Sequence, residues 1–466
     1  MIEVSSVFLA AAKQVFLVGG AVRDILRRGK AHDWDLATDA HPEEVIQLFS
    51  DINRGKKAKK GSDNFRCFVI PTGIKHGTVT LHYKDLKLEV TTFRSDGVYS
   101  NGRHPDNVEF GVSIEEDLSR RDFTMNAAAY KLPKGPLVDP FNGREDIKRR
   151  LIRCVGKPEE RFNEDGLRPM RALRFASQLN FAVDGNLLEA IPAALPLTGM
   201  VAVERIRDEI DKILLTDKPS IAFKLMEETG LLRQLIPELA ACRGVRQDKK
   251  NGMHLFDVLD HSLLCCDYTA RDNGHDKSSL ALCLASLYHD IGKSITAKLN
   301  EDGEWTFHKH ESESSEIARK ILLRFRYPNS VIDKCCHLIK EHMFSYDANY
   351  SDAAVRRFII RVGEENLKDL FSLRRADAYA TAAKEMKHDN LLPLIKHIEK
   401  VMEQSRAFTI KDLSIGGKDL IMEGILPGKH MGIILEELLE AVIEDPELNK
   451  REKLLEIAGN INKRYI

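Results

Sequence analysis

The spacing of apolar and polar positions changes near residue 140. Before that point, short β-branched and aromatic runs alternate with turn residues, which predicts strands at 15–18, 65–70, 78–83 and 86–93. After it the strand signals vanish, and apolar residues recur every three or four positions, as at Leu167, Met170 and Leu173. We therefore expect a small α/β head followed by a long all-α body.

Turn-forming clusters divide this layout further. A cluster at 140–143 (PFNG) precedes a charged segment, and a polar stretch at 243–252 precedes a region rich in histidine and cysteine. Neither a fixed-period repeat nor a low-complexity tract is visible in the sequence. The predicted domains are a head (1–140), a helical neck (141–245), a helical body (246–385) and a helical tail (386–466).

Charge and composition narrow the class of protein. The chain has 466 residues with 70 Lys and Arg against 71 Asp and Glu, so its formal net charge is −1. That balance excludes a uniformly basic nucleic-acid coat protein, although it permits local basic patches. With 43% hydrophobic and 30% charged residues, the composition is globular and not that of a disordered chain.

The apolar runs and the cysteines indicate in which cellular compartment the protein is expected. No run approaches the roughly 18 apolar residues of a membrane span, and the start of the chain lacks a charged segment before its apolar stretch. Eight cysteines include two adjacent pairs but no CxxC spacing. We expect no membrane association, a cytoplasmic location, and buried thiols instead of disulfides or a zinc ribbon.

A glycine pair follows the first predicted strand. In FLVGGAVRD the strand 16–18 runs into Gly19 and Gly20, and a helix is expected to begin near Ala21. Such a turn presents helix N-terminal amides to an anion, and Arg23 in the first turn could grip a triphosphate. A tight turn with a surface arginine is the alternative interpretation.

Two carboxylates follow this turn at i and i+2. On a strand, Asp33 and Asp35 point to one face while Trp34 points into the core. Carboxylates held so close repel each other unless a cation lies between them, and Mg²⁺ with a nucleoside triphosphate is the usual solution. Glu89, on a neighbouring strand, alternates correctly to supply a third acid. A solvated turn is the alternative, but the nearby glycine turn favours a catalytic metal site.

Five motifs occur together in this chain. They are GGAVRD, DWD, RRDFTMNA, DPFNGREDI and NEDGLRPMRALRF, in that order between residues 19 and 175. Because of these motifs and their order, residues 15–240 resemble class II tRNA nucleotidyltransferases, the CCA-adding enzymes, and their bacterial poly(A) polymerase relatives. The resemblance implies an α/β polymerase-β-like nucleotidyltransferase head, a neck that holds the base of the incoming nucleotide, and a body and tail that grip tRNA. It implies tRNA, ATP and CTP as partners.

The same resemblance implies that Asp165 and Arg168 read the base without a nucleic-acid template. Cytosine and adenine both place an amino donor beside an unprotonated ring nitrogen, whereas uracil and guanine place a carbonyl beside a ring N–H. A carboxylate and an arginine therefore fit C and A. A solvated charged helix is the alternative, weakened by apolar residues at the same spacing. The nucleotide contacts implied are Gly20, Arg23, Asp165, Arg168, Arg171, Arg174 and one of Arg120 and Arg121, which the sequence leaves undecided.

A basic stretch lies in the head between the first helices and the strand at 65–70. It could contact the acceptor end of tRNA through phosphates, or form a mobile solvated loop. Its residues are Arg54, Lys56, Lys57, Lys59 and Lys60.

A set of histidines and aspartates in the body resembles the H…HD…D ligands of the HD phosphohydrolase superfamily. These are His261, the pair His289 and Asp290, and Asp377. The set suits a transition metal such as Ni²⁺ or Mn²⁺ with an open position for water. Hydrolysis and a purely structural role stay open. Three further histidines, His310, His337 and His342, could be ligands for a second metal or ordinary surface histidines.

The function expected is addition of C, C and A to tRNA 3′ ends by two-metal nucleotidyl transfer. An enzyme that adds only A is an alternative, whereas one that adds only CC is disfavoured because residues 91–110 resemble the flexible loop needed for A addition. Poly(A) polymerase, or an HD metal phosphohydrolase with an RNA-binding head, are further alternatives. The oligomeric state stays open.

Overall fold

A computed structural model describes residues 1–466 except 32, 58–66, 98–107, 248–255, 274–275, 348, 383–388, 405–408 and 465–466. Contacts within the chain divide it into two units, Met1–Ala240 and Ala241–Ile466, which we describe one at a time. The finer division into head, neck, body and tail stays a prediction.

A seven-stranded mixed sheet forms the centre of the head. Its order is β3-β4-β5-β2-β1-β8-β9, in which β2 and β5 are the parallel pair. All four predicted strands form; the last ends at Thr92, and the second begins at Cys67. The strands are β1 (Val15–Val18), β2 (Trp34–Thr38), β3 (Cys67–Gly73), β4 (Thr78–Tyr83), β5 (Leu86–Thr92), β8 (Ala129–Lys131) and β9 (Leu137–Val138), with a separate pair β6 (Arg94–Asp96) and β7 (Val108–Phe110).

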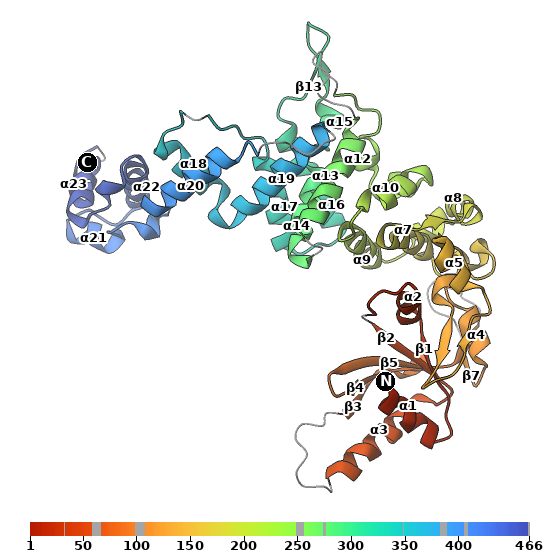
Figure 1. Ribbon diagram of the computed structural model, residues 1–466. Helices are drawn as coiled ribbons and strands as arrows, with labels where there is room; N and C mark the ends of the chain where they lie inside the picture. The colour runs from red at the N-terminus through yellow and green to blue at the C-terminus, as the bar shows by residue number, and fades with distance from the viewer. Residues whose placement is uncertain are drawn as a thin grey trace. The chain divides into compact units, whose positions relative to one another are not determined.

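Both faces of this sheet are covered, which explains the unbroken apolar sequence of β1. Val15 and Leu17 belong to a core shared with α1 (Ile2–Ala10) and α3 (Pro42–Lys57), which pack on one face (Figure 1). Phe16 and Val18 belong to a second core, shared with α4 (Ile114–Ser119). The alternation of side chains along a strand thus sends neighbouring residues into different cores.

The rest of the first unit is helical apart from short strands. The prediction that strands end near residue 141 is wrong in detail, because β10 (Leu151–Ile152) and β11 (Ala182–Val183) pair in parallel. Two-residue strands carry too few alternating positions to be seen in a sequence pattern. The other helices are α2 (Gly20–Leu26), α5 (Gly143–Arg149), α6 (Pro158–Glu164), α7 (Arg168–Leu179), α8 (Gly185–Gly199), α9 (Val203–Leu214), α10 (Pro219–Glu228), α11 (Leu231–Leu235) and α12 (Pro237–Ala240).

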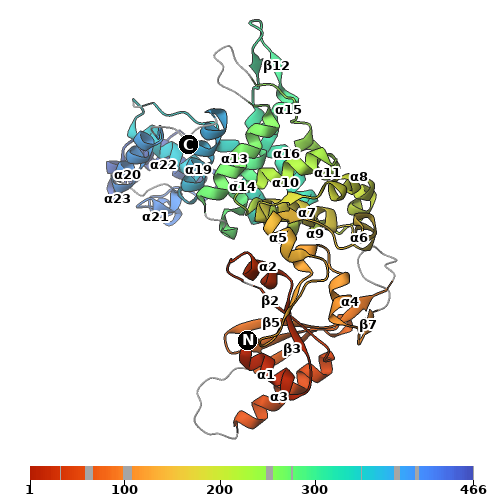
Figure 2. The same cartoon turned by 45° about the vertical axis from the view of Figure 1, so that its right-hand side comes forward.

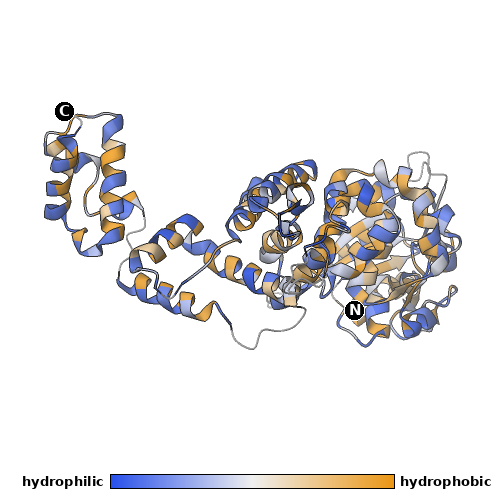
Figure 3. Ribbon diagram, turned by 90° about the horizontal axis from the view of Figure 1, so that it is seen from above, coloured by the Kyte–Doolittle hydropathy of each residue, from blue (hydrophilic) through white to orange (hydrophobic). Residues whose placement is uncertain are grey.

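The second unit is built from amphipathic helices, whose apolar and polar stripes are visible in Figure 3. A separate core closes its C-terminal end, around Leu420, Leu438 and Leu454. Among the described residues, no helix is long and apolar enough to cross a membrane. The helices are α13 (Val258–Asp272), α14 (Leu280–Tyr288), α15 (Lys293–Thr296), α16 (His310–Arg324), α17 (Asn329–Glu341), α18 (Asp352–Val362), α19 (Glu364–Ala382), α20 (Leu392–Gln404), α21 (Gly417–Met422), α22 (Lys429–Glu444) and α23 (Arg451–Asn462), with a hairpin of β12 (Lys298–Leu299) and β13 (Trp305–Thr306).

All eight cysteines are buried and free. The prediction of thiols without disulfides is therefore confirmed. Burial raises the pKa of the Cys242 thiol to about 12, so this group stays protonated at neutral pH.

Candidate functional site

One cavity of about 740 Å³ in the first unit brings together most of the residues singled out in the sequence. It lies where the end of β1 and the start of β2 meet α2 and α7. Its lining includes Gly19, Gly20, Arg23, Asp33, Asp35, Glu89, Arg120, Arg121, Asp122, Asn126, Asp165, Arg168, Arg171, Arg174, Phe175, Gln178 and Lys212. We call this the nucleotide pocket, after the ligand that the sequence resemblance implies.

The glycine turn of the nucleotide pocket depends on Gly19. This residue has φ +68°, in the left-handed region that side chains disfavour. A Cβ atom placed there would lie 3.2 Å from both Arg121 Nη1 and Asp35 Oδ2. The absence of a side chain therefore lets a cation and a carboxylate approach the start of α2, which begins at Gly20, one residue before the predicted start.

The acidic residues come from two parallel strands. Asp35 on β2 lies directly opposite Glu89 on β5. The sequence predicts Glu89 on a neighbouring strand, and the structure adds the register of the pair. Asp33 lies one residue before β2 and is exposed, while Trp34 packs against the core on the other face. Burial and the negative charges of Glu89 and Asp33 raise the pKa of Asp35, against the opposing effect of Arg121. Such crowding of like charge favours a bound cation.

Arg120 and Arg121 both line the nucleotide pocket, and both donate to Asp117. Arg120 donates from Nε and Nη2 to Asp117 Oδ1, at 3.1 and 2.8 Å. Arg121 donates from Nη2 to Asp117 Oδ2 at the longer distance of 3.4 Å. Its charge also acts to lower the pKa of Asp35, and its Nη1 lies 3.2 Å from where a Cβ of Gly19 would be. Arg121 is therefore the better placed of the two to meet a triphosphate beside the carboxylates.

Arg23 is held in place by two polar neighbours. Its Nε and Nη2 donate to Asp24 at 2.8 and 3.0 Å, and its Nη1 donates to Asn126 Oδ1 at 3.0 Å. Asn126 in turn donates to Asp122 Oδ1 at 3.3 Å. Asp122 and Asn126 were not singled out in the sequence, although both lie within RRDFTMNA.

The two expected base-reading residues have separate hydrogen-bond partners. Asp165 accepts from both terminal nitrogens of Arg205, at 3.1 and 2.7 Å. Arg168 donates to the carbonyl oxygens of Arg161 and Arg120, at 2.9 and 3.1 Å, and to the carboxylate of Glu164. Both side chains line the nucleotide pocket, but they do not bond to each other.

The next two arginines of α7 are also paired with acids. Arg171 donates from Nε and Nη2 to Asp122 Oδ2, at 2.8 and 2.6 Å. Burial would raise the pKa of Asp122, but the charge and hydrogen bonds of Arg171 outweigh it and hold the pKa at about 2. Arg174 donates to Glu209 at 2.5 Å and lies over the Phe175 ring, 3.8 Å from its centroid. These arginines are paired with acids within the fold, unlike those of a solvated charged helix.

Part of the basic stretch (Lys59, Lys60) and of the loop at 91–110 (98–107) lies outside the described residues. Both interpretations of the basic stretch stay open.

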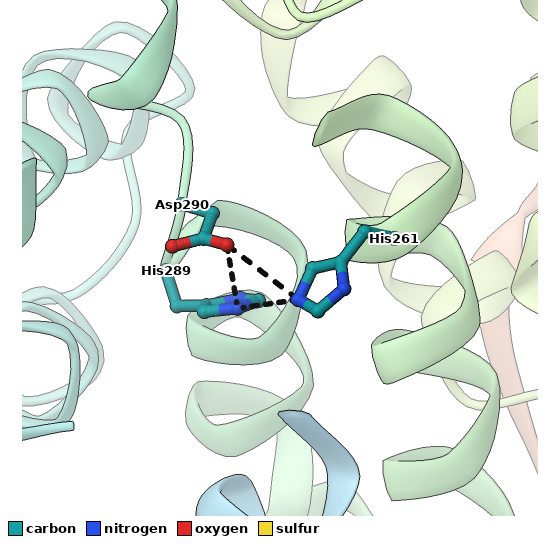
Figure 4. Close-up of side chains that lie close together, drawn as sticks. All are labelled: His261, His289 and Asp290. Atoms are coloured by element: carbon teal, nitrogen blue, oxygen red, sulfur yellow. Dashed lines mark hydrogen bonds and ion pairs between the residues drawn. The ribbon is translucent and has the colours of Figure 1, made fainter. Parts of the chain in front are cut away.

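A second group of titratable residues is buried in the second unit. His261 on α13 and the pair His289 and Asp290, which follow α14, point toward one another (Figure 4). The two Nε2 atoms of His261 and His289 are 3.3 Å apart, and Asp290 Oδ2 lies 3.5 and 3.4 Å from them. Asp377 Oδ1 lies 3.2 Å from His261 Nε2. All four predicted ligands are therefore brought together.

Two further histidines meet the other oxygen of Asp290. The Nε2 atoms of His310 and His342 lie 3.2 and 3.9 Å from Asp290 Oδ1. Burial lowers the pKa of His342 to about 3, so its imidazole is neutral, as a metal ligand must be. His337 is elsewhere, with its Nε2 2.7 Å from the Val362 carbonyl oxygen, and does not belong to this group.

These residues form two overlapping groups that could hold a metal ion. One is His261, His289 and Asp290, and the other is Asp290, His310 and His342. In three of the histidines, Nδ1 faces a backbone carbonyl oxygen, at 2.9 Å in His289, 2.8 Å in His310 and 2.6 Å in His342. A carbonyl only accepts, so Nδ1 carries the proton and Nε2 keeps its lone pair for a metal.

Family models match three parts of the chain. The Poly A polymerase head domain matches residues 15–153, and the probable RNA and SrmB-binding site of polymerase A matches 180–243. The putative tRNA nucleotidyltransferase domain 2 matches 300–458. Fold and site thus define a nucleotidyltransferase with a polymerase head, as the sequence predicted.

Two relatives match different shares of the chain. The CCA-adding enzyme of Limosilactobacillus reuteri (strain DSM 20016) is 31% identical over 97% of this chain and 94% of its own length. That of Geobacillus kaustophilus is 45% identical over 49% of this chain and 52% of its own. The chain belongs to the CCA-adding enzyme family.

Solved structures agree with this assignment. The Bacillus stearothermophilus CCA-adding enzyme in complex with CTP matches over 100% of this chain and 97% of that chain, with a TM-score of 0.70 and 28% identity. The Thermotoga maritima CCA-adding enzyme complexed with tRNA matches with a TM-score of 0.56 at 19% identity, which shows a shared fold.

Proposed function

We propose that this chain acts in the cytoplasm and adds C, C and A to the 3′ ends of tRNA from CTP and ATP. The observation that carries this proposal is the nucleotide pocket, in which the strand carboxylates Asp35 and Glu89 share one cavity with Asp165 and Arg168 of the neck. One part of the cavity suits phosphoryl chemistry, and another suits recognition of a base.

In the reaction, the 3′ hydroxyl of the RNA attacks the α-phosphorus of the triphosphate, and pyrophosphate leaves. Mg²⁺ bound by Asp33, Asp35 and Glu89 would neutralise charge on the phosphates and acidify the hydroxyl. The raised pKa of Asp35 fits such a site, because a cation relieves the repulsion among the carboxylates. Arg23 and Arg121 border the same part of the pocket and supply fixed positive charge for the leaving pyrophosphate.

Base choice falls to Asp165 and Arg168. A carboxylate that accepts from an exocyclic amino group, beside a guanidinium that donates to the ring nitrogen, fits C and A. A carbonyl in place of the amino group would face the carboxylate without a proton between them, at a cost of about 1–3 kcal/mol. The neck thus replaces a nucleic-acid template.

The test is incorporation of labelled CTP and ATP into tRNA that lacks its 3′ end. We expect C alone from CTP, and the complete CCA sequence from both nucleotides together. Incorporation of A alone, directly onto the truncated tRNA, would indicate poly(A) polymerase activity. Incorporation of A only onto tRNA that already ends in CC would indicate an A-adding enzyme. No incorporation at all would contradict the proposal.

A second activity is favoured by the buried cluster of the second unit. Four histidines and two aspartates meet there around the two oxygens of Asp290. Imidazole nitrogens with carboxylates suit first-row transition metals such as Ni²⁺ or Mn²⁺, which acidify bound water. We propose that the cluster holds metal and hydrolyses a phosphoester. The first ion belongs to His261, His289, Asp290 and Asp377, and a second to Asp290, His310 and His342.

Metal content tests this second proposal independently of catalysis. His310→Ala should lower the bound metal of the purified full chain by about half, and Asp290→Ala should remove nearly all of it. His337→Ala is the matched control, since His337 bonds to a backbone oxygen outside the cluster. Wild-type protein that binds no transition metal after dialysis against Ni²⁺ or Mn²⁺ would contradict the proposal.

A further inference from the structure

A second, strongly basic pocket lies in the first unit where three helices end. Its cavity of about 400 Å³ is lined by four cationic side chains and by no carboxylate. Figures 1 and 2 both show α2 and α5 side by side at this place. The lining residues are Leu26, Arg27, Arg28, Ile147, Lys148, Arg150, Leu179, Asn180 and Phe181. We call this the basic pocket.

The backbone around the basic pocket adopts an unusual conformation. One or two residues after the ends of α2, α5 and α7, Arg28, Arg150 and Asn180 have φ of 58°, 54° and 52°. Glycine or asparagine is the usual residue in this left-handed region, and a longer side chain costs about 1 kcal/mol. Two of the three positions nevertheless hold arginine, so stability alone does not account for the residues found there.

Attraction of cations to helix C-termini is the simplest alternative explanation. It does not account for the lack of local partners. Arg28 and Arg150 make no side-chain hydrogen bond or ion pair within the described part of the chain. The other two lining cations have acids nearby: Lys148 Nζ is 3.6 Å from Glu145, and Arg27 Nη1 is 3.8 Å from Asp24, which accepts two hydrogen bonds from Arg23. Burial lowers the pKa of Arg27, and the charges of Arg23 and Arg150 lower it further against the effect of Asp24.

The basic pocket and the nucleotide pocket are connected by two helices. α2 begins at Gly20 in the nucleotide pocket and ends beside Arg27 in the basic pocket, and α7 likewise runs from Arg168 to Asn180. At 1.5 Å per residue, α2 spans about 10 Å and α7 about 18 Å. A strand whose 3′ end lies in the nucleotide pocket therefore has its preceding few nucleotides within reach of the basic pocket.

We propose that the basic pocket binds a backbone phosphate of the RNA acceptor, a few nucleotides before its 3′ end. The inference rests on the proposed function for the identity of the RNA. Arginine forks match the oxygens of a phosphodiester, and unpaired cations at the surface provide the counterion release that drives binding to a polyanion. The apolar wall of Leu179 and Phe181 suits contact with the adjoining ribose.

The test is the salt dependence of tRNA binding by the double variant Arg28→Gly, Arg150→Gly. Glycine accepts the left-handed conformation at both positions, so the variant loses two charges without added backbone strain. We expect the dissociation constant for tRNA without its 3′ end to rise about tenfold at 50 mM salt. The slope of log K against log salt should fall by about one to two units, and the KM for CTP should stay unchanged.

Arg149→Ala is the matched control, because Arg149 lies on the same helix, pairs with Glu145 at 3.1 Å and does not line the basic pocket. A double variant with the same slope as this control would overturn the proposal. Loss of inorganic phosphate binding without a change in the slope for RNA would also overturn it, since the pocket would then serve a free anion. The binding measurement needs no catalytic turnover. It therefore tests the basic pocket even if the protein fails to add nucleotides, so the failure of one proposal can be told from the failure of the other.

Discussion

Arg205 engages both oxygens of Asp165, with Nη1 3.1 Å from Oδ1 and Nη2 2.7 Å from Oδ2. The backbone N–H of Leu167 also donates to Oδ1, at 3.0 Å. A carboxylate offers about four acceptor sites. Three are used, and the remaining one is on Oδ2, the oxygen that in the proposed function would receive the amino group of the incoming base.

Replacement of Asp165 should change which nucleotides are accepted. In Asp165→Ala the group that penalises a carbonyl is gone, so kcat/KM for UTP relative to CTP should rise about tenfold. Arg168→Ala should instead lower kcat/KM for both CTP and ATP, because it removes the donor to their ring nitrogen. The measurement is kcat/KM for all four nucleotides. Asp165→Ala with wild-type preference ratios would remove Asp165 from base reading.

Arg205 should act on the same selectivity through Asp165. Arg205→Lys keeps a charge but loses the two-pronged contact, so the carboxylate gains freedom to rotate. We expect a lower preference for CTP over UTP in Arg205→Lys and a greater loss in Arg205→Ala. A purely structural role would lower the melting temperature and leave the preference ratios of the folded protein unchanged.

The strand carboxylates should be needed for transfer but not for tRNA affinity. Asp35→Asn should lower the rate of nucleotide addition by at least about a hundredfold, or roughly 3 kcal/mol in the barrier, while tRNA binding stays within about twofold. Asp85→Asn is the control, because Asp85 is exposed in the turn after β4. Addition by Asp35→Asn at more than a tenth of the wild-type rate would exclude Asp35 from metal binding.

The pair of Asp122 and Arg171 should make the first unit sensitive to acid. The pKa of Asp122 is about 2 in the folded chain against 3.8 as its ordinary value, so ionisation stabilises the fold by on the order of 2 kcal/mol. This contribution is complete above about pH 4 and is lost as the pH falls through about 2. Asp122→Asn should therefore weaken hydrogen-exchange protection of α7 at pH 7, and less so near pH 3. An equal difference at both values would contradict the assignment.

In the first unit, the sequence predicted the candidate site residues better than the side chains that hold them in place. Glu89 could be expected to supply a third acid beside Asp33 and Asp35 because strand alternation fixes which face a side chain takes, whereas its position opposite Asp35 comes from the register of β2 and β5. Arg205 could not be linked to Asp165, because 40 residues separate them and only the packing of α9 against α7 brings them together. Asp122 and Asn126 lie within the motif RRDFTMNA, but nothing in its spacing shows that they bond to Arg171 and Arg23.

In the second unit, the sequence predicted four residues of the buried cluster but not which further histidines join it. His261, His289, Asp290 and Asp377 were expected to share a site, whereas His310, His337 and His342 could not be told apart. Only the ends of α16 and α17 decide that His310 and His342 reach Asp290 while His337 turns toward Val362.

The pairing of Asp35 with Glu89 limits how the chain can change in length. A single-residue insertion within β5 would turn Glu89 toward the core under α1 and α3, and would bring an aliphatic side chain beside Asp35. An insertion in a connection between strands leaves that pairing intact. Homologues that keep the nucleotidyl-transfer chemistry should therefore differ in length between these strands and not inside them. A homologue with one residue inserted in β5 should lack nucleotide addition.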